Sequence, residues 1–210
     1  AASDVYKRQD RKSMFKERKH MKKFSVVISR QFGSLGRPIA HEMSEILNVE
    51  YYDRDIVTMV AKEHNITIKE VSALEEKATK YSIMKFPLGT GTTAAQDKIF
   101  DTEAKLIREI ADKESCIIVG RCADYILRDN PDAVHIFIHG DEAVKKERIM
   151  KLYNKTEKEA VDMMRDMDKK RKMHYNYYTE GEWGKATNYT MTLNSSKLGF
   201  DKCIDIISEL

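Results

Sequence analysis

Residues 24–48 change from a strand pattern to a helix pattern across a single glycine-containing turn. Residues 24–29 form a short run rich in β-branched side chains, which is typical of a buried strand. Pro38 suits the first position of a helix, and Asn48 can end that helix. Between them, apolar side chains recur at helical spacing: Ile39, Ala40, Met43, Ile46 and Leu47. A strand, a turn and a helix in this order predict a βα unit.

The rest of the chain repeats this alternation. Further strands are predicted near 49–52, at 116–119, at 133–138 and at 189–193, and helices at 56–60, 68–80, 97–113, after Asp141, after Thr156 and at 200–207. Thr156 and Glu159 match a capping box, and residues 81–97, with Pro87, Gly89 and Gly91, predict a flexible loop. We therefore expect an α/β fold whose parallel sheet is covered on both faces. Ligands of such sheets bind beyond the carboxyl ends of the strands, here after Ser29, Tyr52, Val119 and Leu193.

Charge and composition exclude several classes of protein. The first 20 residues hold seven of the 37 Lys and Arg and three of the 34 Asp and Glu, which leaves 30 basic and 31 acidic residues in the remaining chain. That balance argues against nucleic acid as a partner. No apolar run approaches the roughly 20 residues that cross a bilayer. The three cysteines and six histidines show neither disulfide nor metal-site spacing, so we predict no metal cage and a cytoplasmic location.

Residues 1–20 differ in character from the rest of the chain. They are basic and lack apolar periodicity, and residues 4–9 read like a translated sequencing-adapter end. Lys16 and Glu17 followed by Met21 resemble a translated ribosome-binding site and a natural start. We therefore expect residues 1–20 to be a non-native or disordered extension. Residues 21–210 have a length that suits a single domain.

The turn at 29–37 has the features of a phosphate-binding loop. Gly33, Ser34 and Gly36 allow close approach of an anion to backbone N–H groups, with a helix N-terminus behind them. The full pattern G-x-x-x-x-G-K-[ST] is absent. In one register Arg37 replaces the lysine and Pro38 the hydroxyl residue. In the other register Gly36 takes the lysine position and Arg37 the hydroxyl position. The alternative interpretation is an ordinary glycine turn between a strand and a helix.

The helix after the capping box carries a cationic face. Arg165, Asp168 and Lys172 share one face at about 100° per residue, Arg171 lies at its border, and apolar residues form the other face: Ala160, Met163, Met164 and Met167. Such a face can close over a polyphosphate and neutralise charge on a transferred group. The alternative is a solvated face held by ion pairs.

Two further strand ends carry charged side chains. Arg121 follows Gly120 after a buried strand and could grip a phosphate, or it could pair with a nearby acid. Asp53 and Arg54 follow the second strand, where they could hold a hydroxyl and a phosphate of an acceptor, or form an ordinary turn. Cys122 has no base marked for it and is interpreted as a buried filler.

Together these segments resemble the cytidylate kinase-like proteins, which are bacterial relatives of nucleoside monophosphate kinases. The resemblance rests on ordered blocks that cover roughly residues 23–208: 28–37, 52–54, 119–121, 168–171, 177–179, 183–184 and 194–199. It implies a P-loop kinase fold with a five-stranded parallel sheet, an acceptor-binding region at about 53–112 and a lid at about 148–180. It also implies phosphoryl transfer from ATP, with Mg²⁺, to CMP or dCMP, so the expected partners are small-molecule nucleotides.

The same resemblance suggests roles for individual residues. Gly33, Ser34, Gly36 and Arg37 would cradle the donor phosphates, and Arg30 or Arg37 would supply the charge of the missing lysine. Arg54 and Arg121 would hold the acceptor phosphate. Arg165, Asp168 and Arg171 would act from the lid, the arginines on transition-state charge and Asp168 by orienting them or the acceptor. Departures from the family pattern, including Cys122 where cytidylate kinases have Asp, leave open a non-catalytic nucleotide sensor or a kinase for another small acceptor.

Overall fold

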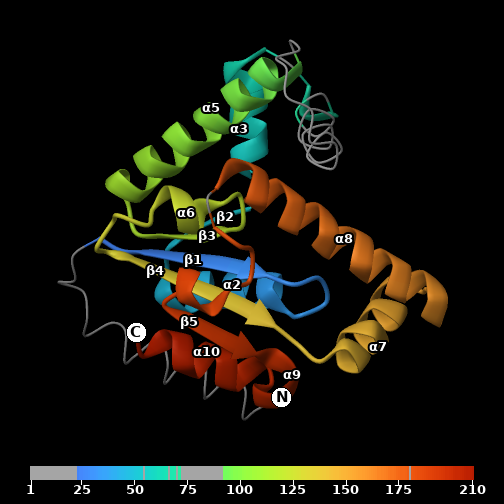
Figure 1. The fold of residues 1–210 in the computed structure, drawn as a ribbon. Helices are drawn as coiled ribbons and strands as arrows, with labels where there is room; N and C mark the ends of the chain where they lie inside the picture. The colour runs from blue at the N-terminus through green and yellow to red at the C-terminus, as the bar shows by residue number, and fades with distance from the viewer. Residues whose placement is uncertain (1–22, 54, 66, 70, 72–91, 180) are drawn as a thin grey trace.

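A computed structural model describes residues 23–53, 55–65, 67–69, 71, 92–179 and 181–210. Its centre is a five-stranded sheet in the order β2-β3-β1-β4-β5, and every neighbouring pair of strands is parallel (Figure 1). The strands are β1 (Ser25–Arg30), β2 (Glu50–Tyr52), β3 (Cys116–Val119), β4 (Ala133–His139) and β5 (Met191–Asn194). The predicted parallel sheet is confirmed, and its strand ends lie within two residues of the expected ones.

Side-chain alternation along β1 divides the core into two layers. Val27 faces a cluster built with α3 (Asp55–Glu63), α5 (Thr92–Lys113) and α6 (Ala123–Ile126). Its neighbours Val26 and Ile28 face the opposite cluster, built with α2 (Gly36–Leu47) and α10 (Phe200–Ser208). Because successive strand residues point to opposite faces, a continuous apolar run buries both sides of the sheet. Figure 1 shows these two helical layers above and below the strands.

Two helices begin earlier than the sequence suggested. Helix α2 begins at Gly36, so Pro38 lies inside the first turn, where its missing N–H still removes no helical hydrogen bond. Helix α5 begins at Thr92, so the prediction of a loop at 81–97 was wrong for its last residues. Ala94 and Ala95 favour helix and extend it toward the threonine pair. The rest of that loop, most of the predicted helix at 68–80 and the extension at 1–20 lie outside the described residues.

Two consecutive helices, α7 (Glu142–Tyr153) and α8 (Glu157–Tyr178), lie beyond the carboxyl ends of the strands. Ile149, Ala160 and Met164 form a third apolar cluster between them, with Phe32 packed against it. The far end of α8 reaches α5, where the rings of Phe100 and Tyr178 stack at 4.1 Å. Helix α8 therefore spans the edge of the sheet at which ligands of parallel sheets bind. Short segments complete the chain: η1 (Ala186–Asn188) and α9 (Ser195–Leu198).

The predicted capping box at the start of α8 is confirmed. The Thr156 hydroxyl accepts the backbone N–H of Glu159, and the Glu159 carboxylate accepts the backbone N–H of Thr156 at 2.9 Å. We expect Thr156→Ala to lower the free energy of unfolding by about 1 kcal/mol, because one end of this reciprocal pair is lost. Urea unfolding measures the change, and Thr156→Ser, which keeps the hydroxyl, should lie close to the parent protein. Equal stability of the alanine and serine variants would contradict this role.

Among the described helices, none has both the length and the apolar character that a membrane span requires. The cysteines at 116, 122 and 203 are buried free thiols.

Candidate functional site

The loop between β1 and α2 is shaped by its own backbone bonds. The N–H of Gln31 donates to the carbonyl of Ile138 at 2.9 Å, and the buried Ser34 hydroxyl donates to the carbonyls of Gln31 and Ile138. The Ser34 side chain therefore braces the loop and leaves only its backbone N–H for an anion. Leu35 has a φ of 64°, in the left-handed region that bulky side chains rarely adopt. Helix α2 begins directly after this turn, at Gly36, so its N-terminus borders the loop.

The side chain of Arg30 lies in a slot between two glycines. A Cβ on Gly36 would lie 2.5 Å from the Cβ of Arg30, and a Cβ on Gly120 would overlap its Nη1. Burial and the nearby guanidinium of Arg171 lower the pKa of Arg30, while Asp53 opposes that change. The slot thus holds a positive charge at the carboxyl end of β1 that its surroundings only partly compensate.

Further predicted residues meet around this arginine. Asp53 pairs with Arg37 at 2.5 Å and lies 3.7 Å from Nη2 of Arg30. Arg121 donates to the buried carboxylate of Glu103 at 3.1 Å. Arg37 and Arg121 are near enough to Arg30 to lower its pKa as well. The structure therefore brings together Arg30, Arg37, Asp53 and Arg121, as the strand-end argument predicted. Arg54 lies outside the described residues.

The peptide after β3 is held in an unusual conformation. Gly120, Arg121 and Cys122 have φ values of 77°, 58° and 52°. Two successive non-glycine residues in the left-handed region are costly and occur mainly where a fixed side-chain position is needed. Here the turn presents Arg121 to Glu103 and buries Cys122, which agrees with the interpretation of Cys122 as a buried side chain.

Helix α8 contacts the loop through two charged side chains, in addition to the apolar contacts of Phe32. Asp168 accepts the backbone N–H of Phe32 at 2.6 Å. Arg171 donates to the carbonyl of Arg30 at 3.1 Å and to Asp168 at 3.2 Å, and its guanidinium lies 5.7 Å from the centre of the Phe32 ring. Burial raises the pKa of Asp168, while the Phe32 N–H, Arg171 and Lys145 act in the opposite direction. A carboxylate thus occupies one of the loop N–H groups that an anionic ligand can use.

The predicted assignment of faces on α8 was wrong in one respect. Asp168 continues the buried line of Ala160 and Met164 at intervals of four residues, and Arg171 follows three residues later. Arg165 and Lys172 are exposed, and Lys172 lies 3.9 Å from Glu182. A step of four residues turns a helix by 40° beyond one full turn, so Asp168 lies nearer to Met164 than to Arg165. The structure therefore places Asp168 and Arg171 at the loop, with Arg165 on the solvent side.

Lys145 is a residue of the site that sequence reasoning missed. It lies in the first turns of α7 with only 6% of its surface exposed, and its Nζ donates to Oε1 of Gln31 at 2.8 Å. The same Nζ lies 3.9 Å from Asp168, and a Cβ on Gly33 would press on the Lys145 stem. Burial lowers the pKa of Lys145. A signal existed, since Lys145 precedes the buried Ile149 by four residues and so shares its inward face.

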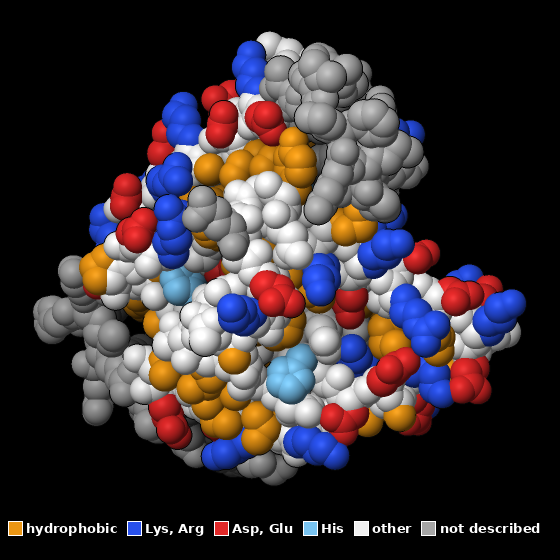
Figure 2. All heavy atoms as spheres, viewed as in Figure 1, with side chains coloured by type: hydrophobic (Ala, Val, Ile, Leu, Met, Phe, Trp, Pro, Cys, Tyr) orange, Lys and Arg blue, Asp and Glu red, His pale blue; other side chains and the backbone are white. Residues whose placement is uncertain are grey.

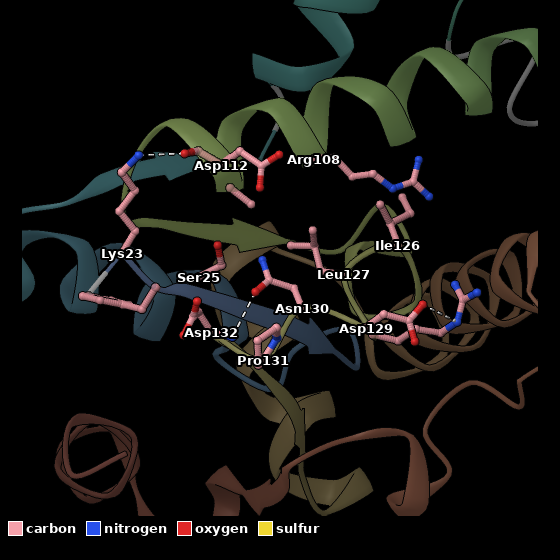
Figure 3. A pocket seen from close by; sticks show the side chains of 13 residues that line it. Lys23, Ser25, Arg108, Asp112, Ile126, Leu127, Asp129, Asn130, Pro131 and Asp132 are labelled. Carbon is pink, nitrogen blue, oxygen red and sulfur yellow. Dashed lines mark hydrogen bonds and ion pairs between the residues drawn. The ribbon is translucent and has the colours of Figure 1, made fainter. Parts of the chain in front are cut away.

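Two cavities of similar volume differ in how they relate to this cluster. One of about 640 Å³ is lined by residues 30–38, by residues of α7 and by Arg171. The other, of about 670 Å³, lies at the opposite end of β1 and is lined by Lys23, Arg108, Asp112 and residues 126–132 (Figure 3). Its Lys23 already donates to the carbonyl of Asp112, and its Arg128 lies 3.7 Å from Asp129. The cavity beside the arginines is the candidate site.

The face of the molecule seen in Figure 2 is not uniformly basic. Figure 2 shows Lys and Arg side chains interspersed with Asp and Glu on the face of the molecule that is seen there.

Comparison with known proteins identifies the family of the chain. The model of the cytidylate kinase-like family matches residues 25–197. The chain belongs to this family. A search of the curated proteins finds no match. A solved structure described as an uncharacterized protein from Eubacterium ventriosum is 31% identical, with a TM-score of 0.70, and the match covers 89% of this chain and 97% of that one.

Solved structures of lower identity share the fold. A shikimate kinase from Bacteroides thetaiotaomicron is 14% identical with a TM-score of 0.51, covering 89% of this chain and 97% of that one. TT1252 from Thermus thermophilus is 12% identical with a TM-score of 0.51, covering 90% and 99%. The chain therefore has a P-loop kinase fold.

Proposed function

We propose that the protein is a phosphotransferase that moves the γ-phosphoryl group of ATP to CMP or dCMP. The observation that carries this proposal is the cluster of Arg30, Arg37, Arg121 and Arg171 around a loop of backbone N–H groups. Phosphoryl transfer needs little covalent chemistry from a protein and depends on positioning and on neutralising charge. The cluster provides both at one end of the sheet.

In this proposal each group has a defined task. Backbone N–H groups of the loop and Arg30 hold the donor phosphates, and Arg121 holds the phosphate of the acceptor. An oxygen of that acceptor phosphate bonds to the γ-phosphorus while the bond to the bridging oxygen of ADP breaks, so the products are ADP and the cytidine diphosphate. Arg171 neutralises charge on the transferred group, Asp168 orients Arg171, and Asp53 orients Arg30 and Arg37.

Magnesium is assigned no protein ligand. The general motif has a hydroxyl that binds the ion at position 37 or 38, depending on the register, and this chain has an arginine paired with Asp53 at 37 and a proline at 38. Within the described residues, no group of three or more His, Cys, Asp or Glu could form a cage. Mg²⁺ typically keeps several waters and binds through substrate phosphates, so it would arrive as part of the Mg·ATP complex.

The decisive experiment is a coupled assay of ADP release. The acceptors are CMP, dCMP, UMP and AMP, together with small hydroxylated acids and sugars. We expect turnover with CMP or dCMP and little with the other acceptors. Turnover only with an acceptor that carries a hydroxyl group would show that the protein is a phosphotransferase with a different acceptor. Equilibrium binding of ATP without turnover on any acceptor would contradict the proposed activity and indicate a non-catalytic nucleotide sensor.

A further inference from the structure

The conformation of Leu35 favours one register of the phosphate loop. The general motif places a glycine immediately before its lysine, and Leu35, with a φ of 64°, adopts the backbone conformation that favours glycine. Counting from this position, residue 30 stands where the motif has its first glycine, residue 36 where it has lysine, and residue 37 where it has Ser or Thr. Of the two registers that the sequence left open, the structure favours the one with Gly36 at the lysine position.

In this register the glycine and the cationic residue of the motif have exchanged places. The motif has glycine first and lysine seventh, whereas this chain has arginine first and glycine seventh. We propose that Arg30 is the phosphate-binding cation of the loop, and that Gly36 is required to make room for its stem. This inference rests on the proposed function and adds to it the residue that replaces the missing lysine.

Packing ties the two positions to each other. A Cβ on Gly36 would lie 2.5 Å from Cβ and 2.8 Å from Cγ of Arg30, so the stem of the arginine occupies the space that a side chain at 36 needs. The guanidinium continues across the loop to Gly120, where a Cβ would overlap Nη1. A lysine at 36 and an arginine at 30 therefore exclude each other, since packed interiors do not yield by an ångström without cost.

The guanidinium of Arg30 has unused capacity for an anion. Its Nε is buried and has no hydrogen-bond partner among the described residues. Its Nη2 lies 3.7 Å from Asp53, too far for a good hydrogen bond. The side chain is 14% exposed and contributes to the wall of the 640 Å³ cavity. A buried donor without an acceptor is costly, and phosphate oxygens form strong charge-assisted hydrogen bonds with a guanidinium.

Arg37 is the competing candidate and fits less well. Its side chain is 44% exposed, against 14% for Arg30, and it already pairs with Asp53 at 2.5 Å. An exposed, paired arginine gains less from a phosphate than a buried one, because solvent screens its charge. The geometry therefore assigns the principal contact to Arg30.

The first test removes the charge and keeps the stem. Isothermal titration of Mg·ATP and of inorganic tripolyphosphate should show Arg30→Met binding both about 10- to 100-fold more weakly than the parent, which corresponds to the loss of a hydrogen bond to a charged group. Lys202→Met, on the exposed side of α10, removes an equal charge elsewhere and should leave both affinities unchanged. Circular dichroism and thermal unfolding verify that each variant is folded.

The second test moves the cation back to its usual position. Gly36→Lys alone should weaken tripolyphosphate binding, because its Cβ displaces Arg30. Arg30→Gly alone should weaken binding by removing the charge. The double variant Arg30→Gly/Gly36→Lys should bind tripolyphosphate within about tenfold of the parent. Arg30→Gly makes room for the side chain at 36, and Gly36→Lys restores the positive charge that is lost at 30.

The outcomes separate this inference from the proposed function. If the parent binds neither Mg·ATP nor tripolyphosphate, the proposed function fails and the inference fails with it. If the parent turns over but Arg30→Met binds tripolyphosphate equally well, only the inference is overturned. A double variant that binds no better than Arg30→Gly also overturns the exchange of positions, whatever the acceptor of the enzyme is.

Discussion

Arg171→Ala is expected to lower kcat for phosphoryl transfer by about 10³-fold, while the affinity for ATP changes much less. An arginine that meets charge formed only in the transition state has an effect of this size in related chemistry. The guanidinium of Arg171 lies at the loop, 3.1 Å from the carbonyl of Arg30 and 3.2 Å from Asp168. These two hydrogen bonds fix the guanidinium at the loop, so little reorganisation is needed when charge develops.

The electrostatics of Arg171 support this expectation. Burial lowers the pKa of Arg171, and the neighbouring Arg37 lowers it further, while Asp168 and Asp53 raise it. A guanidinium in this position interacts strongly with added negative charge because little water screens it. Removing it should therefore affect the step in which charge spreads over the transferred group more than the binding of the donor.

Single-turnover and steady-state kinetics with ATP and CMP measure the effect. Lys169→Ala is the matched control, because Lys169 is exposed on the same helix and also carries one positive charge. Arg171→Lys should recover only part of the rate, since a lysine cannot reproduce the planar fork. A kcat for Arg171→Ala within threefold of the parent would show that Arg171 serves the packing of α8 and takes no part in the reaction.

Much of the fold could be predicted from local patterns because those patterns agree with the tertiary structure. The run before Gly120 and the opening strand are buried on both faces, and the capping box at Thr156 forms as a local unit. Likewise, Asn48 ends α2 in the left-handed conformation that its position predicted. In these places the local sequence pattern and the tertiary packing favour the same structure.

The candidate site was less predictable because long-range contacts decide it. Arg30, Asp53 and Arg121 were found because parallel strands end at one edge, but the slot between Gly36 and Gly120 depends on residues 84 positions apart in the sequence. Lys145 was missed because a lysine on an amphipathic helix is usually at the surface, and here Gln31 and Asp168 make its burial possible. Arg165 was included because a cationic face was judged by charge, whereas the buried line through Met164 orients α8.

Arg121→Ala should have two large effects that a second substitution can separate. Arg121 donates to Glu103, whose side chain is only 1% exposed. Removing one member of a buried ion pair leaves the other charge poorly compensated, so we expect the free energy of unfolding to fall by about 3 kcal/mol. If Arg121 also binds the acceptor phosphate, the KM for CMP should rise by about 10- to 100-fold.

The double variant Arg121→Ala/Glu103→Gln distinguishes these effects. The neutral amide at 103 no longer leaves a buried charge, so most of the lost stability should return in urea unfolding. The KM for CMP should stay high, because the cation that meets the acceptor phosphate is still absent. Arg128→Ala is the control, since Arg128 lies 3.7 Å from Asp129 in an exposed pair and its loss should cost less than about 1 kcal/mol. A double variant with both stability and the parent KM restored would show that Arg121 serves the fold alone, and the acceptor phosphate would then need another partner.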